Sequence, residues 1–301
     1  MVRGLVVLLA ALLFGHAAPA QTQITIGYGL AGDFLPAFVA KDEGIFAKNG
    51  LDASMKVMQS SSLVPAILAS GGVQIGINTP PNLLLAAAGG LDQVAIAGAA
   101  RLKRSDPRIG LVAKPGLSVT KPADLAGKRV GVPGINSVID LVLKKWVIDG
   151  KVPLERVRFI EAAAPRMGDM LKSDQLDAVA IFEPLLSRFV ASGAGVKSVD
   201  FFSEVNPDML GSFWAATRQW ASANPQAVAS FRRSLAEAQD FIARDPEKAK
   251  AIEAKYLHFA EPKLPSFEVA MRAKDLDYFI ALCRELGILH QPLDASKLIF
   301  E

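Results

Sequence analysis

The sequence predicts an α/β protein built as two lobes, with a helical tail packed on one of them. Through roughly the first 200 residues, short β-rich runs alternate with helical patterns, which is typical of parallel strands joined by crossover helices. From about Gln219 onward the pattern changes to helices alone. Removing a leader of 20 residues from the 301 leaves 281, a length that suits two domains.

Residues 1–20 have the features of a secretory signal peptide. Arg3 supplies the basic start, residues 5–14 form an apolar run, and Ala18-Pro19-Ala20 form a small-residue ending. The apolar run is shorter than the ~20 residues that a bilayer-spanning helix needs. Because no cysteine follows the small residues, we expect cleavage after Ala20 and a periplasmic protein without a lipid anchor.

The composition argues against several function classes. The leader carries only Arg3, so the mature chain has 32 basic and 30 acidic side chains and a net charge of +2. This balance, without long runs of like charge, argues against binding to nucleic acid or membrane surfaces. The single cysteine, Cys283, cannot form an internal disulfide, and its apolar helical neighbours favour a core position over a reactive thiol. His258 and His290 are too isolated for a zinc site or a histidine-based triad, so no metal is expected.

Individual elements follow from local patterns. Strands are expected where short β-rich runs lie between turn signals. These runs are residues 24–29, 53–58, 73–77, 94–98, 109–113, 129–132, 157–160, 178–181 and 196–199. In the tail, Asn224-Pro225 and Asp245-Pro246 each give a helix cap followed by a first-turn proline. Apolar residues recur at spacings of three and four through residues 228–242, which predicts an amphipathic helix there.

Gly27, Gly29 and Gly32 have the G-x-G-x-x-G spacing of a dinucleotide-binding loop. Such a loop also needs an acidic residue at the end of the next strand, where it holds the ribose hydroxyls. Here the nearest acid, Asp52, stands at the beginning of that strand, and Asp33 would bring a carboxylate close to the pyrophosphate. We therefore expect no dinucleotide and no other cofactor. A tight turn, in which the backbone approaches a ligand or a facing loop, accounts for the glycines.

Residues 32–57 read "GDFLPAFVAKDEGIFAKNGLDASMKV". Asp33 can cap a helix, Pro36 suits its first turn, and Gly44 and Gly50 end successive helical pieces. This segment resembles the first lobe of periplasmic substrate-binding proteins of ABC importers in the nitrate, taurine and aliphatic sulfonate family.

Three further segments carry the same resemblance, which covers nearly the whole mature chain. They are "DLAGKRVGVPGINS", "LKSDQLDAVAIFEP" and "SANPQAVASFRRSLAEAQDFIARDPEKA". The chain departs from the family pattern at Asp174, where the family has a glycine, and at Gln74, where it has an aspartate. Asp is among the few non-glycine residues that enter the left-handed region readily, so Asp174 can replace the glycine. We expect neither change to threaten the fold.

The resemblance implies a type II periplasmic-binding-protein fold, in which each lobe is a mixed, mostly parallel sheet flanked by helices. Residues 21–112 and 211–301 would form lobe 1, with the helical tail on it, and residues 113–210 would form lobe 2. It also implies a monomer that captures a small organic solute, most readily an anion such as a sulfonate or carboxylate, in the cleft between the lobes. The partners would be an ABC permease and its ATPase at the inner membrane.

The resemblance further places the ligand at the ends of strands and the starts of helices. In this sequence those places hold Leu30, Ala31, Gly32, Asp33, Phe34, Ser60, Ser61, Ser62, Asn78, Thr79, Arg101, Ile135, Asn136, Ser137 and Glu183. Backbone N–H groups that are free at helix starts attract carboxylate, sulfonate or phosphate. Simple helix capping is the alternative for any one of these residues, but six loops converging on one crevice favour ligand binding.

Two of the candidates have their own alternatives. Arg101 can neutralise an acidic ligand through paired hydrogen bonds, or it can belong to a solvated charged loop with Lys103, Arg104 and Arg108. Trp214 can stack on a ligand or pack in the core.

An enzyme on the same scaffold is the alternative function, because the fold is similar to that of sulfinate desulfinases and of pyrimidine-precursor synthases. Those enzymes use a cysteine or a histidine cluster in the cleft loops, and neither the serines at 60–62 nor their neighbours supply one. A receptor sensor domain is a third possibility, but no transmembrane helix follows to relay a signal. We therefore expect no catalytic residue.

Overall fold

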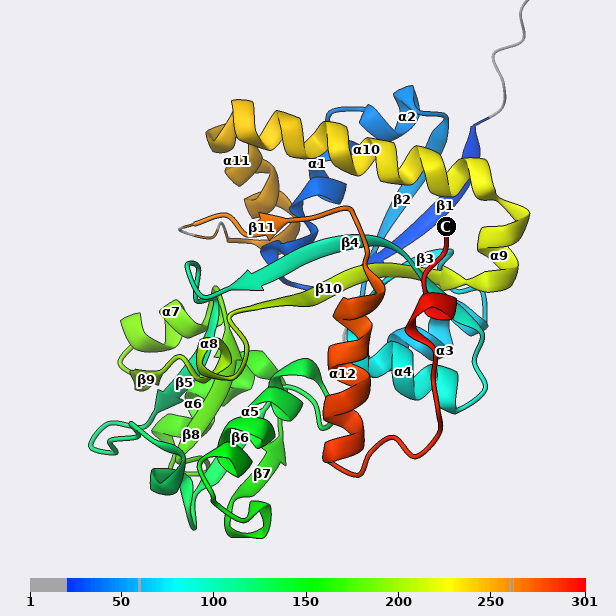
Figure 1. The fold of residues 1–301 in the computed structure, drawn as a ribbon. Helices are drawn as coiled ribbons and strands as arrows, with labels where there is room; N and C mark the ends of the chain where they lie inside the picture. Colours follow the sequence, from blue (N-terminus) through cyan, green and yellow to red (C-terminus); the bar gives the residue numbers. More distant parts are fainter. Residues whose placement is uncertain (1–20, 59–60, 260, 262) are drawn as a thin grey trace, which may run out of the picture.

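The computed structural model describes residues 21–301 except 59, 60, 260 and 262, so the predicted leader lies outside the described residues. The strands form two sheets, which Figure 1 shows in two lobes. The first has the order β11-β4-β10-β3-β1-β2 and the second β7-β6-β8-β5-β9. In chain order the strands are β1 Thr22–Tyr28, β2 Leu51–Val57, β3 Ile75–Asn78, β4 Gln93–Lys103, β5 Ile109–Ala113, β6 Arg129–Val132, β7 Arg158–Glu161, β8 Ala178–Phe182, β9 Val196–Val199, β10 Asp208–Thr217 and β11 Ser266–Phe267.

Both sheets are mixed, as predicted, but neither is mostly parallel, because three of the five pairings in the first sheet and two of the four in the second are antiparallel. β1 is parallel to β2 and β3, and β6 is parallel to β7 and β8. β10 runs against β3 and β4, β11 against β4, and β5 against β8 and β9. Because parallel neighbours need a crossover connection, helices separate successive parallel strands and cover the sheets.

The helices of the tail begin where the sequence signals predict them, although the side chain of Asn224 does not cap α10 and instead donates Nδ2 to the carbonyl of Trp220 at 2.9 Å. α10 begins at Pro225 and buries Val228, Phe231 and Leu235, and Asp245 caps α11 by accepting the backbone N–H of Lys248 at 3.1 Å. The α-helices are α1 Leu35–Asp42, α2 Ile45–Lys48, α3 Val64–Ala69, α4 Pro80–Ala88, α5 Val138–Asp149, α6 Met167–Lys172, α7 Leu185–Ala191, α8 Phe201–Val205, α9 Arg218–Ala223, α10 Pro225–Arg244, α11 Pro246–Leu257 and α12 Ala273–Glu285. Short 3-10 helices include η1 Gly32–Phe34 and η2 Ser61–Leu63.

The tail packs mainly on the first sheet but also reaches the second lobe. α10 and α11 pack against α1 (Figure 1). α12 packs against α4 and also touches α5, where Lys145 Nζ lies 2.9 Å from Glu285 Oε1. Cys283 is fully buried on α12, and burial raises the pKa of its thiol to about 11. The thiol is therefore a core group and is poorly suited to act as a nucleophile.

The chain passes between the sheets at residues 104–108 and again at 206–207. β5 pairs within the second sheet and β10 within the first, so both crossings lie a few residues before the predicted lobe boundaries at 112/113 and 210/211. The crossings are tied together, because Arg104 donates its backbone N–H to the carbonyl of Pro207 at 2.8 Å and its guanidinium to the carbonyl of Ser203 at 2.6 Å.

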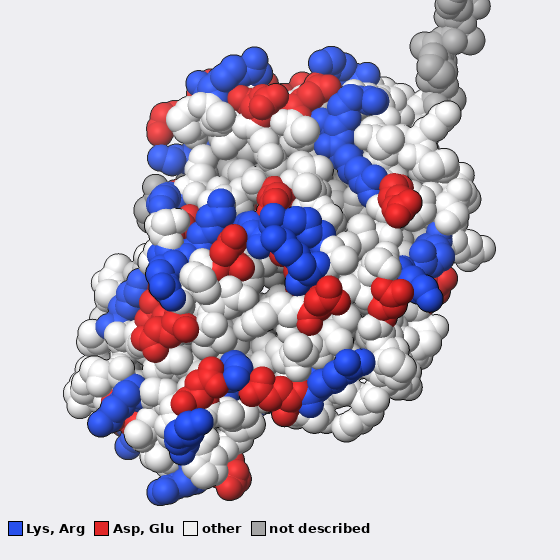
Figure 2. All heavy atoms as spheres, in the orientation of Figure 1, with Lys and Arg blue, Asp and Glu red and all other residues white. Residues whose placement is uncertain are grey.

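The surface carries charges of both signs. On the face drawn in Figure 2, lysine and arginine are interspersed with aspartate and glutamate. Among the helices of the described residues, none is long and apolar enough to cross a membrane.

Candidate functional site

The loop after β1 brings several predicted residues to one place on the first sheet. Leu30 is 45% exposed and Ala31 is half-buried, while Gly32 is buried at the start of η1. The carboxylate of Asp33 accepts a hydrogen bond from the hydroxyl of Ser212 on β10 at 2.8 Å. Asp33 therefore holds the loop against the neighbouring strand.

The end of β3 carries polar atoms that lack partners. The side-chain oxygen of Asn78 accepts the backbone N–H of Thr79 at 2.8 Å. Asn78 Nδ2 and Thr79 Oγ1 are both buried, and neither has a hydrogen-bond partner among the described residues. Because β3 is parallel to β1, these atoms stand at the same sheet edge as the Gly32 loop. Buried polar atoms are nearly always satisfied, so these two are candidates for hydrogen bonds to a bound molecule.

The loop after β6 is ordered by contacts with acidic side chains. Ile135 is 41% exposed and donates its backbone N–H to Glu161 at 3.1 Å. Asn136 adopts a left-handed conformation with φ of 62° and donates its N–H to Asp140 Oδ2 at 2.7 Å. Ser137 caps α5 by accepting the N–H of Asp140 at 3.4 Å. Ser137 therefore acts as a helix cap, which was the alternative to ligand binding for each of these residues.

Glu183 directly follows β8, and its side chain binds the first turn of the next helix, α7. Its carboxylate accepts the backbone N–H of Ser187 at 3.1 Å and the hydroxyl of the same residue at 2.8 Å. Its own backbone N–H donates to the carbonyl of Arg108 at 2.8 Å. Glu183 therefore ties the second sheet to the 104–108 crossing.

Arg101 differs from both of its predicted roles. It lies within β4, is only 7% exposed, and does not belong to a solvated loop. Its guanidinium lies 2.6 Å from Asp208, 3.2 Å from Glu268 and 3.0 Å from Asp275. Three carboxylates of the protein thus neutralise the charge that we expected to hold an anionic ligand. The strand was predicted to end before Arg101, which is why the residue was assigned to a loop.

Trp214 packs in the core and does not face a ligand. It is 1% exposed on β10, with its ring centroid 5.3 Å from that of Phe34 and 5.5 Å from that of Phe231. Both contacts are edge-to-face, a favourable arrangement for aromatic pairs. Of the two alternatives for Trp214, the core position therefore describes its place in the structure, and the ring of Phe34 is buried beside it.

The serine cluster is only partly described. Ser60 and the side chain of Ser61 lie outside the described residues, and Ser62 is exposed on η2. Their expected role as hydrogen-bond donors stays a prediction.

A buried ionic cluster beside Gly32 was not predicted. Arg108 and Glu261 form a buried ion pair through Nη2 and Oε2, and Glu261 Oε1 accepts the backbone N–H of Gly32 at 3.0 Å. Glu253, on α11, accepts the backbone N–H of Glu261 at 2.8 Å, and its Oε1 is buried without a partner among the described residues. The only sequence signal was a charged residue immediately before the strand at 109–113, because the partners lie more than 140 positions away.

The close approach of this cluster explains the glycine at position 32. A Cβ at Gly32 would lie 2.4 Å from Glu253 Oε1 and 2.6 Å from Glu261 Oε1. Glycine therefore allows the backbone to approach both carboxyl groups. The predicted close approach of the glycine loop to another part of the protein is confirmed at this position.

Glu253 should make stability depend on pH. Burial raises its pKa from 4.5 to about 7. Between these pH values the folded protein holds a proton that the unfolded chain has lost, so this contribution to stability falls as pH rises from 4.5 to 7. Glu253→Gln keeps an acceptor for the Glu261 N–H but cannot ionise. At pH 8 the free energy of unfolding of this variant should therefore exceed that of wild type by roughly 3 kcal/mol. Urea unfolding at pH 4.5 and 8 tests this, and an advantage that is equal at both pH values would contradict it.

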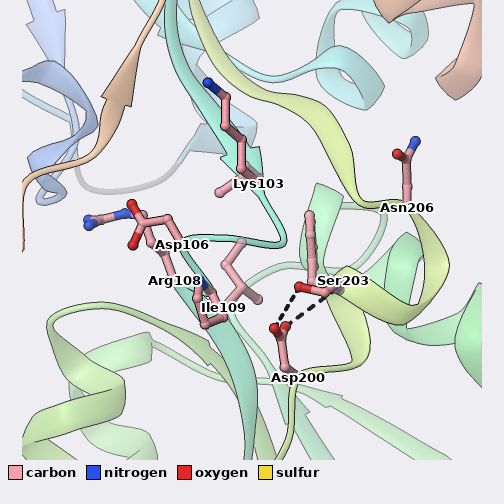
Figure 3. A pocket seen from close by; sticks show the side chains of 10 residues that line it. Lys103, Asp106, Arg108, Ile109, Asp200, Ser203 and Asn206 are labelled. Atoms are coloured by element: carbon pink, nitrogen blue, oxygen red, sulfur yellow. Dashed lines mark hydrogen bonds between the residues drawn. The ribbon is translucent and has the colours of Figure 1, made fainter.

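Two hollows of different size lie near the crossings and near Arg101. The hollow in Figure 3, between the two crossings, has a volume of about 10 Å³, which is room for about one water molecule. Around it, Asp106 and Arg108 extend to one side, away from Asp200 and Ser203. A second pocket of about 200 Å³ lies beside Arg101 and Tyr278. The volume beside Gly32 is instead occupied by the buried ionic cluster.

Comparisons with known proteins agree with this architecture. Residues 31–249 match a family model described as NMT1/THI5 like. A candidate binding protein of Brucella abortus is 29% identical over 220 residues, which cover 73% of this chain but only 66% of that protein, just under two thirds of its length. The taurine-binding periplasmic protein of Escherichia coli is 26% identical, with 80% of this chain and 72% of that protein covered.

A solved structure gives the same result for the fold. The alkanesulfonate-binding protein SsuA from Xanthomonas axonopodis pv. citri, bound to MOPS, is similar with a TM-score of 0.79 and 17% sequence identity. The similarity covers 94% of this chain and 99% of that one. The predicted two-lobed binding-protein fold is therefore confirmed.

Proposed function

Because the chain belongs to the NMT1/THI5-like family, we propose that it captures a small organic anion between its lobes and delivers it unchanged to an ABC import permease. In this proposal the protein acts in the periplasm as a monomer, and an ATPase at the inner membrane drives import. Relatives whose names include taurine binding and alkanesulfonate binding support a sulfonate as the solute, and a carboxylate is the alternative organic anion.

The observation that carries this proposal is the pair of buried polar atoms at the end of β3. Asn78 Nδ2 and Thr79 Oγ1 have no partner among the described residues. A buried polar group without a hydrogen bond costs about 1–3 kcal/mol, so a site that keeps two of them needs a compensating gain. Hydrogen bonds to a solute would supply that gain, and they need no reactive group.

Exposed apolar side chains in the same loops favour an organic solute. Leu30 follows β1, Leu63 follows β2 and Ile135 follows β6, and they are 45%, 55% and 41% exposed. Large apolar side chains at the ends of strands in both sheets can cover the carbon skeleton of a solute, while the polar atoms bind its head group.

Cysteine-dependent chemistry on this scaffold receives no support. Cys283, the only cysteine of the sequence, is fully buried on α12, and the pKa of its thiol is raised by that burial. A thiol in this position is neither accessible nor readily ionised.

Thr79→Val tests the proposal directly. The variant removes a hydroxyl that has no partner, so its thermal stability should equal or exceed that of wild type, while solute affinity should fall about tenfold. The assay is calorimetric titration with each hit from a thermal-shift panel of sulfonates, carboxylates and amino acids.

Thr217→Val is the matched control. Thr217 caps α9 by accepting the backbone N–H of Trp220 at 3.2 Å, so its loss should cost about 1 kcal/mol of stability without changing affinity. Equal solute affinity for Thr79→Val and wild type would count against the binding role of this strand end.

A further inference from the structure

Glu261 is held from two sides by groups that would also bind an anionic solute. On the side of the first sheet, the backbone N–H of Gly32 donates to Glu261 Oε1 at 3.0 Å. On the other side, Arg108 reaches Oε2 from a backbone that is hydrogen-bonded to Glu183 of the second lobe. One carboxylate therefore joins the two lobes.

The segment carrying Glu261 is fastened to the crossing at residues 104–108 by further contacts. Arg108 Nη1 donates to the carbonyl of Lys263 at 2.9 Å, and Lys263 Nζ lies 3.0 Å from Asp106. The side chains of Arg108 and Glu261 are 6% and 0% exposed. The position is thus dry, and a guanidinium in such a place binds a carboxylate or sulfonate strongly.

A second observation shows that this position is short of hydrogen-bond donors. Glu253 Oε1 is buried without a partner among the described residues and packs against Gly32. Glu253, Glu261 and Asp33 thus gather near one guanidinium, and the charge of Asp33 raises the pKa of Glu253 further. An additional anion would be repelled while Glu261 stays in place.

We propose that Glu261 is a tethered substitute for the acidic group of the solute: its carboxylate occupies an anion site formed by the Gly32 N–H and Arg108, and an acidic solute enters by displacing it. The identity of the site as the solute's head-group position rests on the proposed function. The anion site itself does not, since it is defined by the contacts of Gly32, Arg108 and Glu261.

Rescue by formate is the test. Glu261→Ala removes the carboxylate and leaves space beside Arg108, so sodium formate should bind there and raise the Tm saturably by about 2–4 °C per kcal/mol of binding free energy gained. Wild type, with the site filled, should show no such rise above that given by sodium chloride at equal ionic strength. Adding Arg108→Gln to Glu261→Ala should abolish the response.

Asp275→Ala is the matched control, because it also removes a buried carboxylate from an arginine. In this variant Arg101 still forms ion pairs with Asp208 and Glu268, so its charge stays neutralised and formate should not raise the Tm. A formate response of Glu261→Ala no larger than that of wild type or of Asp275→Ala would overturn the proposal.

A second variant covers the case in which Glu261→Ala does not fold. Glu261→Gln keeps the size and an acceptor but removes the charge, so it should bind formate at least about tenfold more tightly than wild type does. Equal formate affinities would overturn the proposal. If wild type binds a panel solute but no variant responds to formate, the anion-site proposal fails and the proposed function stands. If formate rescues Glu261→Ala but no panel solute binds, the result counts against the proposed function alone.

Discussion

Replacing Trp214 by alanine should lower the free energy of unfolding by about 3–5 kcal/mol, the usual cost of deleting a large aromatic ring from a core. The ring is 1% exposed and packs against Phe34 and Phe231, so its removal leaves a cavity beside these two rings. Urea unfolding followed by circular dichroism measures the loss.

Trp220→Ala is the control for this substitution. Trp220 is only partly buried, on α9, so the same deletion should cost clearly less. A Trp214→Ala protein that unfolds like wild type but binds solute weakly would contradict the core assignment and return the residue to the ligand surface.

Replacing Arg108 by alanine should destabilise the protein by about 3–5 kcal/mol, because it leaves the buried Glu261 carboxylate without its cation. The substitution also removes the side-chain link between the second lobe and the Gly32 loop. Adding Glu261→Gln should recover part of the loss, since the unpaired charge is then absent. Denaturant unfolding of the four proteins of this double-mutant cycle gives the coupling between the two side chains.

Arg104→Ala is the matched control on the same crossing. Arg104 is exposed and donates its guanidinium to a carbonyl, that of Ser203, so its loss should cost about 1 kcal/mol. If Arg108→Ala cost no more than Arg104→Ala, the buried ion pair would not be a significant link between the lobes.

Strands with a clear local signal in the sequence were predicted correctly. The runs at 109–113, 129–132 and 196–199 coincide with β5, β6 and β9, because each is a short β-rich stretch between turns. β10 was missed. It is buried along almost its whole length, so it lacks the alternation of a half-buried strand, and its partners β3 and β4 lie more than 100 positions away. β4 continues past the predicted end at Gly98 to Lys103, and in this extension Ala100 and Arg101 pair with both β10 and β11. Alanine has a weak strand preference, so the local sequence does not reveal the extension.

The site was predictable as a set of loops but not as a set of contacts. Residues after β1, β3, β6 and β8 could be named because loops at strand ends are recognisable in sequence. The partners of those residues could not, since Ser212 beside Asp33, and Glu261 beside Gly32 and Arg108, come from distant segments. The side-chain environments of Arg101 and Trp214 depend in the same way on β10, the strand that was not predicted.

The central claim is that the mature protein holds a small organic anion without changing it, and equilibrium dialysis measures this most directly. Wild-type protein is dialysed against a labelled sulfonate or carboxylate from the panel, then denatured, and the released compound is identified by mass spectrometry. We expect one equivalent per chain, recovered chemically intact. Retention of none of the panel compounds, or recovery of a converted product, would contradict the account.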